Sequence, residues 1–277
     1  MIPVCNVLPR LEAELLWMHV LGISREQLWA WPDRPISLDQ QAAVQACFQR
    51  RVQGEPVAYI VGEKPFWDMR LKVTKDTLIP RPETELLVEK ILERYSASSC
   101  LSLLDIGTGS GAIALAIARE RPNWRITALD VSAPALMIAK ENAKQYKVDT
   151  ISFIHSDLFS VVQERFDVIV SNPPYIKEQD EHLTQGDVRF EPLLALVSGA
   201  QGLDIITRII REAPNFLHPQ GLLAIEHGYD QAAKVRQLFA DHSYTALESF
   251  TDLAGIERVS WGTILNRLHS AARYVQT

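Results

Sequence analysis

From residue 101 onward, short apolar runs alternate with longer segments in which apolar residues recur at helical spacing. Runs rich in Val, Ile and Leu predict buried strands, whereas apolar residues three or four positions apart predict helices. The predicted strands cover 101–106, 125–129, 151–154, 166–171, 221–226, 245–250 and 258–261. The predicted helices cover 112–119, 203–217 and 231–240, with another beginning after Ser132. This alternation indicates an α/β domain with a doubly wound parallel sheet.

The first 56 residues carry a different pattern, which is helical throughout. A helix is predicted over 10–21, and Gly22 is suited to end it in a left-handed conformation. Two capping-box sequences, beginning at Ser24 and Ser37, predict the starts of two more helices. The region is either a module that docks a partner or a structural cap, and the spacing of its residues favours neither.

Residues 57–80 join the two parts of the chain. The apolar runs 57–62 and 71–73 are strand-like and predict a β-hairpin. A segment fixed by prolines follows, and a helix is predicted over 84–95. Arg81 lies in the rigid segment, so it is a candidate to reach into a site or, alternatively, a solvated linker residue. The predicted organisation is therefore a helical domain (1–56), a hairpin linker (57–80) and an α/β domain (81–277), whose tail from residue 266 shows no core pattern.

Composition and charge exclude several classes of protein. The chain has 277 residues and a formal net charge of −6, which argues against a dedicated nucleic-acid binder. Its three cysteines are scattered without the spacing of a disulfide framework or a metal site, so a reduced, cytoplasmic protein without a metal is expected. No apolar run is long enough to span a bilayer, and no signal-peptide pattern opens the chain.

A glycine-rich turn at 107–111 follows the first strand of the α/β domain. Such a turn lets the backbone and a helix N-terminus approach a ligand closely. Together with Ala112 the turn also fits the fingerprint of NAD-type dinucleotide binding. Asp130 suits the ribose diol of either a dinucleotide or S-adenosylmethionine. Asp105 separates the alternatives, because a carboxylate there favours a ligand with an ammonium or sulfonium group and opposes a pyrophosphate. S-adenosylmethionine is therefore favoured over NAD.

The sequence Asn172-Pro173-Pro174-Tyr175 follows a predicted strand, at the sheet edge where open α/β folds bind ligands. The prolines stop the strand and hold Asn172 in an extended conformation. The Asn172 side-chain oxygen and the Pro173 carbonyl could then accept both protons of one NH₂ group, with Tyr175 stacked on it. This arrangement suits methyl transfer to an amide or arylamine, because it aims the nitrogen lone pair. The alternative is a simple proline turn in which Asn172 is a local turn former.

Taken together, these motifs resemble those of class I S-adenosylmethionine methyltransferases that act on amino groups. Asn-Pro-Pro-Tyr turns occur in this class in enzymes that modify DNA adenine, RNA guanine N2 and protein glutamine. Other stretches resemble the PrmC/HemK family, whose members are the N5-glutamine methyltransferases of peptide chain release factors. These stretches are 54–56, 66–67, 77–85 and 186–193. The similarity runs in matching order from about residue 10 to 262.

The resemblance implies a helical N-terminal domain joined by a hairpin to a Rossmann-like catalytic domain with a seven-stranded, mostly parallel sheet. It implies that the substrate is the glutamine of the Gly-Gly-Gln loop of release factors, and that S-adenosylmethionine is converted to S-adenosylhomocysteine. The residues assigned to the cofactor are Asp105, Gly107, Thr108, Gly109, Ser110, Gly111, Asp130, Asp157, Leu158 and Asn172. Those assigned to the glutamine are Asn172, Pro173, Pro174 and Tyr175, with Asn172, Pro173 and Tyr175 as the catalytic group.

Five more residues carry expectations. Family members often have an aromatic residue where Leu158 follows Asp157, so adenine stacking would here become aliphatic packing. Phe66 and Trp67 are candidates to close the site over the methionine end, or else they belong to the core of the hairpin. Polar residues at 226 and 227 end a predicted strand, and they are interpreted as the start of a helix rather than as supports of the site.

Other functions share part of this pattern. The sister family that methylates ribosomal protein L3 is similar, although stretches 79–84 and 189–192 favour the release-factor branch. A nucleic-acid amino-methyltransferase usually needs a basic recognition region, whereas this chain is acidic. A non-catalytic S-adenosylmethionine sensor would have no need of the Asn-Pro-Pro-Tyr turn.

Overall fold

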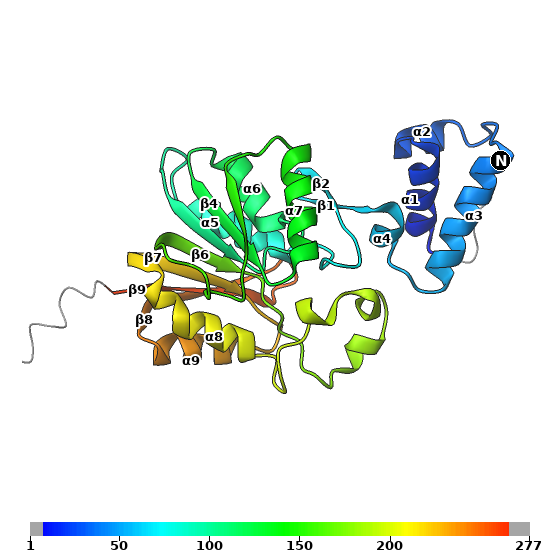
Figure 1. Cartoon of the computed structure of the whole chain (residues 1–277). Coiled ribbons are helices and arrows are strands. Elements are labelled where there is room, and N and C mark those ends of the chain that lie inside the picture. Colours follow the sequence, from blue (N-terminus) through cyan, green and yellow to red (C-terminus); the bar gives the residue numbers. More distant parts are fainter. Residues whose placement is uncertain (1–7, 266–277) are drawn as a thin grey trace, which may run out of the picture.

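The computed structural model describes residues 8–265, so the expected tail from residue 266 lies outside the described part. Figure 1 shows a small helical lobe joined by a hairpin to a larger α/β body. The lobe consists of α1 (Arg10–Leu21), α2 (Arg25–Ala30), α3 (Leu38–Val52) and α4 (Val57–Val61). The prediction of helices here is confirmed in detail, since Gly22 ends α1 with a φ of 63° and both capping boxes form.

The lobe has a small core of its own. Trp17, Leu28 and Val44 are buried against one another, one from each of the first three helices. Such a small apolar cluster supplies little stability, so contacts with the rest of the chain matter for the position of the lobe.

The strand predicted over 57–62 is wrong, because this run forms helix α4. Pro56 precedes the helix and Gly62 ends it with a φ of 82°, which is the usual placing of proline and glycine at helix ends. A short apolar run is compatible with a strand or with a helix, and here packing against α1 and α3 decides. The hairpin is correspondingly shorter than expected, and its strands are β1 (Glu63–Phe66) and β2 (Met69–Lys72).

The α/β body contains a seven-stranded sheet in the order β5-β4-β3-β6-β7-β9-β8, as expected. Six of these strands run in the same direction, and β9 alone among them runs antiparallel, between β7 and β8. The strands are β3 (Ser102–Ile106), β4 (Arg125–Asp130), β5 (Ile151–His155), β6 (Phe166–Ser171), β7 (Leu217–Glu226), β8 (Tyr244–Thr251) and β9 (Glu257–Ile264). The chain order reverses between β3 and β6, where open α/β sheets leave a crevice at the carboxyl ends of the strands.

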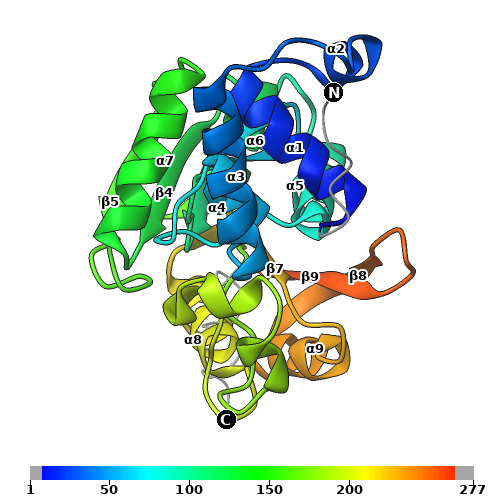
Figure 2. The ribbon, with the colours of Figure 1, turned by 90° about the vertical axis from the view of Figure 1, so that its right-hand side faces the viewer.

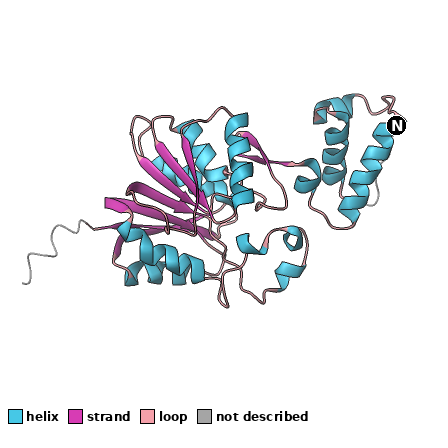
Figure 3. Ribbon diagram, in the orientation of Figure 1, coloured by secondary structure: helices cyan, strands magenta, loops and turns pink. Residues whose placement is uncertain are grey.

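Helices cover both faces of this sheet (Figures 1 and 3). One face is covered by α5 (Glu85–Arg94), α6 (Ala112–Glu120) and α7 (Ala133–Gln145), the other by α8 (Asp204–Glu212) and α9 (Ala232–Asp241). Alternate residues of the central strands enter the two cores, as Val168 and Ile169 of β6 do. The parallel strands therefore read as continuous apolar runs, because both faces are buried.

Short 3₁₀ helices occupy connections that the sequence left as loops or assigned to longer helices. They are η1 (Pro82–Thr84), η2 (Glu181–Thr184), η3 (Val188–Phe190), η4 (Leu193–Ala195) and η5 (Ala213–Asn215). The helix predicted over 203–217 is too long, since α8 stops at Glu212 and Pro214 lies in the 3₁₀ turn that follows. Within residues 8–265, no helix combines the length and the apolar character needed to cross a membrane.

Candidate active site

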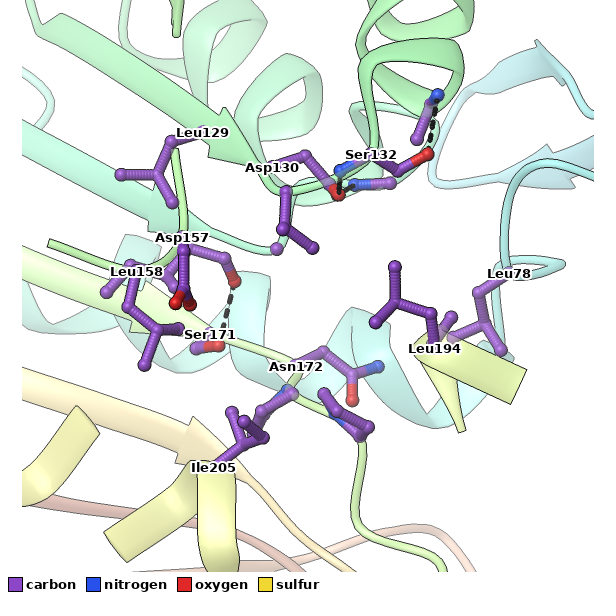
Figure 4. Close-up of a pocket in the computed structure, with 18 of the residues that line it drawn as sticks. Leu78, Leu129, Asp130, Ser132, Asp157, Leu158, Ser171, Asn172, Leu194 and Ile205 are labelled. Carbon is purple, nitrogen blue, oxygen red and sulfur yellow. Dashed lines mark hydrogen bonds between the residues drawn. The ribbon is translucent and has the colours of Figure 1, made fainter. Parts of the chain in front are cut away.

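A cavity of about 360 Å³ opens at the carboxyl ends of β3, β4, β5 and β6 (Figure 4). This size is within the range that small-molecule pockets usually have. Most of the residues singled out from the sequence meet here, because the carboxyl ends of parallel strands share one edge of the sheet. Those on its wall are Gly107, Gly109, Asp130, Asp157, Leu158, Asn172, Pro173 and Pro174.

Asp130 joins the loops that follow β3 and β4. Its two carboxylate oxygens accept hydrogen bonds from the backbone N–H groups of Gly109 and Ser132, both at 2.8 Å. Burial raises the pKa of Asp130, while these backbone donors oppose the rise. Each oxygen keeps a second lone pair. The side chain can therefore hold the glycine turn in place and still accept hydrogen bonds from a ligand.

The glycine turn itself needs left-handed backbone at Gly107, Gly109 and Gly111, whose φ angles are 72°, 56° and 87°. A Cβ on Gly111 would also lie only 3.1 Å from Leu115 of α6, so this glycine permits close packing of the helix. Thr108 and Ser110 are buried and do not line the cavity. Their contribution is to hold the turn rather than to face the ligand.

Asp105 is completely buried beneath this turn. One carboxylate oxygen accepts a 2.7 Å hydrogen bond from the Thr108 hydroxyl, and the other has no hydrogen-bond partner among residues 8–265, although the nearby Ala114 backbone N–H lowers the pKa of the carboxyl. Asp105 does not line the cavity. Burial raises the pKa of Asp105 to about 7. A buried carboxylate with a free oxygen is costly unless a donor or a positive charge approaches it.

The far end of the cavity is formed by Asp157 and Leu158, which follow β5 (Figure 4). Leu158 is 8% exposed and has a φ of 45°, so an aliphatic side chain forms the wall here. Arg208 of α8 approaches the Asp157 carboxylate at 3.4 Å and also lines the cavity. Leu78 and Leu194 form the opposite end (Figure 4).

In the Asn-Pro-Pro-Tyr turn, Asn172 lies on the cavity wall and Tyr175 does not. The Asn172 amide nitrogen donates to the Thr84 hydroxyl at 3.0 Å, so its Oδ1 is the end of the amide left to accept. Tyr175 does not line the cavity. Its hydroxyl donates to Glu226 at 3.4 Å, and its carbonyl accepts from Gln231 at 3.0 Å. The expected stacking of Tyr175 on a substrate amide therefore has no support in this geometry.

Glu226 contacts Tyr175 of this turn and the next helix, α9, begins only at Ala232, so the interpretation of Glu226 as the start of a helix is wrong. It is the last residue of β7 and lies under the turn. His227 is buried beside it and interacts with the Ser260 hydroxyl at 2.8 Å, away from the cavity.

Phe66 and Trp67 do not reach the cavity. Phe66 is buried in the core shared with α5 and α6. The Trp67 indole donates to Glu120 at 3.0 Å, and its backbone N–H donates to Glu85 at 2.7 Å. Both residues therefore fix the hairpin to the α/β body, a role that differs from the two expected for them.

Arg81 also lies off the cavity wall. Its guanidinium pairs with the buried Glu191, which accepts a second hydrogen bond from the Ile79 backbone N–H at 3.1 Å. Burial raises the pKa of Glu191, and Arg81 opposes this effect. The pair fastens the segment before α5 to the long loop between β6 and α8.

Comparisons with known proteins agree with this geometry. Family models match at residues 7–62 (PrmC N-terminal domain) and 82–188 (Methyltransferase small domain). A release factor glutamine methyltransferase of Coxiella burnetii is 48% identical over 91% of this chain and 90% of its own length. The chain belongs to the release factor glutamine methyltransferase family. The Escherichia coli relative of the same description is 44% identical over 92% of both chains.

A solved structure shows the same fold at lower identity. A methyltransferase from Pyrococcus furiosus aligns with a TM-score of 0.56 at 17% identity, covering 80% of this chain and 100% of its own. In this member of the release factor glutamine methyltransferase family, the match to the N-terminal domain ends at Gly62, the residue that caps α4.

Several cavity residues of this family member were not expected from the sequence. They come from the segment after the hairpin, from the long loop and from α8, and they include Thr77, Leu78, Pro192, Leu194, Ile205 and Arg208. The similarity of stretches 77–85 and 186–193 to the family pointed to the segment after the hairpin and to part of the long loop, but not to α8. No group of three or more His, Cys, Asp and Glu side chains within 8–265 is arranged to hold a metal ion.

Proposed function

We propose that this protein transfers the methyl group of S-adenosylmethionine to the side-chain amide nitrogen of the Gly-Gly-Gln glutamine in peptide chain release factors. The observation that carries the proposal is the Asn172 amide at the cavity wall, with its nitrogen bound by Thr84 and its oxygen left to accept. Membership of the family supports the choice of substrate, because the relatives are described as release factor glutamine methyltransferases.

The residues of the cavity fit S-adenosylmethionine better than a dinucleotide. Asp105 lies beneath the glycine turn rather than on the cavity wall, and a carboxylate at this position suits a positively charged ligand and would oppose a pyrophosphate. The second lone pairs of Asp130 suit a ribose diol, and Leu158 offers an apolar wall for an adenine ring. When bound, the sulfonium group of S-adenosylmethionine supplies an electrophilic methyl carbon.

The protein would contribute orientation rather than acid or base chemistry. Asn172 Oδ1 and the Pro173 carbonyl would accept the two protons of the glutamine NH₂ and so aim its lone pair at the methyl carbon. A carbon–nitrogen bond forms as the carbon–sulfur bond breaks. The methylated amide nitrogen is then strongly acidic and releases one proton to water, so no general base is required before transfer.

The proposed partners are release factors, with no direct contact to nucleic acid or membrane. Release factors act on ribosomes, so the proposed place of action is the cytoplasm and the proposed role concerns translation termination.

The test is methyl transfer from labelled S-adenosylmethionine to a purified, unmodified release factor. A release factor with the Gly-Gly-Gln glutamine replaced by alanine is the matched control. Label on the first protein alone supports the proposal, and label on both means that another residue accepts the methyl group. If ribosomal protein L3 or nucleic acid accepts label and the release factor does not, the substrate assignment is overturned.

A further inference from the structure

The Asn172 side chain has two ends of similar shape and opposite hydrogen-bonding character. Its oxygen can accept a proton of a glutamine NH₂, whereas its own NH₂ would meet that group donor to donor. The direction of this amide therefore decides whether the turn can hold the substrate. Any group that fixes the direction acts on the reaction without touching the substrate.

Thr84 is the group that contacts the nitrogen end. It lies in η1, 88 positions before Asn172 along the chain, and it is 4% exposed. A hydroxyl that accepts a hydrogen bond still has its own proton to place. If that proton turned toward Asn172, it would favour the amide oxygen at this position and reverse the side chain.

Glu226 carries a buried acceptor, because its Oε2 has no hydrogen-bond partner among residues 8–265. The carboxyl is buried, and its other oxygen, Oε1, accepts the Tyr175 hydroxyl at 3.4 Å. Burial raises the pKa of Glu226 to about 7, and the charge of Glu83 adds to the rise. The hydroxyls of Thr84 and Tyr175 and the charge of Arg258 oppose it.

We propose that Thr84 and Glu226 are positioning residues that set the direction of the Asn172 amide. Ionised Glu226 takes the Thr84 proton, the Thr84 oxygen accepts Asn172 Nδ2, and Asn172 Oδ1 is turned to the substrate. Protonated Glu226 is itself a donor and competes for the Thr84 oxygen. This inference rests on the proposed function, and it adds two residues that do not line the cavity.

The experiment compares Thr84→Val, Thr84→Ser and Glu226→Gln with the wild type, using a release factor as substrate at saturating S-adenosylmethionine. Thr84→Val removes the hydroxyl at constant shape, and we expect kcat to fall about 10- to 100-fold, as small misplacements of substrate do. Thr84→Ser should stay within about threefold of the wild type, since it keeps the hydroxyl. Thr245→Val, a matched change in β8, should leave kcat unaltered.

Two further readouts separate orientation from a structural role. Binding of S-adenosylhomocysteine, measured by calorimetry, should remain within about twofold in every variant. The kcat of the wild type should rise with pH through about 7, and Glu226→Gln should flatten this profile. A merely structural loss would lower kcat equally at every pH.

The inference is overturned if Thr84→Val retains wild-type kcat, if Thr84→Ser loses as much as Thr84→Val, or if Glu226→Gln leaves the pH profile unchanged. Should Thr84→Val fail to fold, the serine variant and the pH profile of Glu226→Gln decide by themselves. Failure of the proposed function is distinct, because the wild type itself would then not methylate the release factor.

Discussion

Arg51 of α3 donates a 2.8 Å hydrogen bond to Asp187 in the loop between β6 and α8, 136 positions further along the chain. The same guanidinium holds Glu12 of α1 through two hydrogen bonds of 2.6 and 2.9 Å. Arg189 adds a 3.0 Å hydrogen bond to the carbonyl of Gln53. The helical lobe and the loop that walls the cavity are thus joined directly, and Figure 2 shows α3 running toward this loop.

This junction predicts a role in substrate capture. Asp187→Asn removes the charge on the loop and leaves the Arg51–Glu12 pair intact. Because Asp187 is partly exposed, the pair is worth only about 1 kcal/mol, and we expect KM for the release factor to rise about 3- to 10-fold. Steady-state kinetics with varied release factor measure this.

Asp180→Asn is the matched control, because Asp180 pairs with His182 inside the same loop. Its KM should remain at the wild-type value, and binding of S-adenosylhomocysteine should be unaltered in both variants. An equal rise of KM in both would mean that general loosening of the loop, and not its tie to α3, causes the effect.

Asn172→Ala should abolish most turnover and leave cofactor binding nearly unchanged. Loss of an acceptor that aims the reacting group costs about 10²- to 10³-fold in kcat by analogy with other preorganised polar groups. Binding of S-adenosylhomocysteine should change by no more than a few-fold, since Asp105 and Asp130 remain. Parallel measurements of kcat and of binding heat check this, and an equal loss of both would make Asn172 a cofactor ligand or a structural residue.

Asp105→Asn should improve stability and impair binding. The native pKa of about 7 lies above the unfolded value of about 3.9. The folded state therefore binds more protons between these values, and stability falls as pH rises from about 4 to 7 and stays low above it. The variant should be more stable than the wild type at pH 8, by on the order of a few kcal/mol, with a smaller gain at pH 5.

Urea unfolding of the ligand-free protein at both pH values measures this difference. The raised pKa of Glu226 also makes folding stability fall as pH rises, so the Asp105→Asn variant should keep part of this pH dependence. Binding of S-adenosylmethionine should weaken at least tenfold, because the negative charge beneath the glycine turn that favours its positive charge is lost. A variant that is less stable at pH 8 and binds as the wild type does would show that Asp105 is purely structural.

Leu158→Ala tests the aliphatic wall at the far end of the cavity. Removing most of a buried leucine side chain from a ligand contact costs about 1.5 kcal/mol, so binding of S-adenosylhomocysteine should weaken about tenfold. Leu194→Ala, at the opposite end, should raise KM for the release factor and leave this binding unaltered. If both variants weaken cofactor binding equally, the adenine does not lie against Leu158.

Much of the fold could be predicted from the local pattern of apolar residues along the sequence. Apolar runs alternating with helices are enough to indicate a doubly wound sheet, and parallel strands bring their carboxyl ends to one edge whatever the loops contain. Asp130, Asp157 and Asn172 therefore meet at the cavity, as their positions after strands predict. The one strand placed wrongly, at 57–62, is a short apolar run whose identity depends on the helices beside it.

The sequence by itself determined most strands and helices of the α/β domain and the glycine turn, because these depend on neighbours within a few positions, and the order of strands and helices then fixed the edge at which the site lies. Only the tertiary structure decided where side chains with distant partners turn. Tyr175 faces Glu226, Arg81 faces Glu191, and Asn172 is held by Thr84. Each of these contacts joins segments many positions apart, and the choice of partner depends on burial, which exists only once the helices have packed on the sheet.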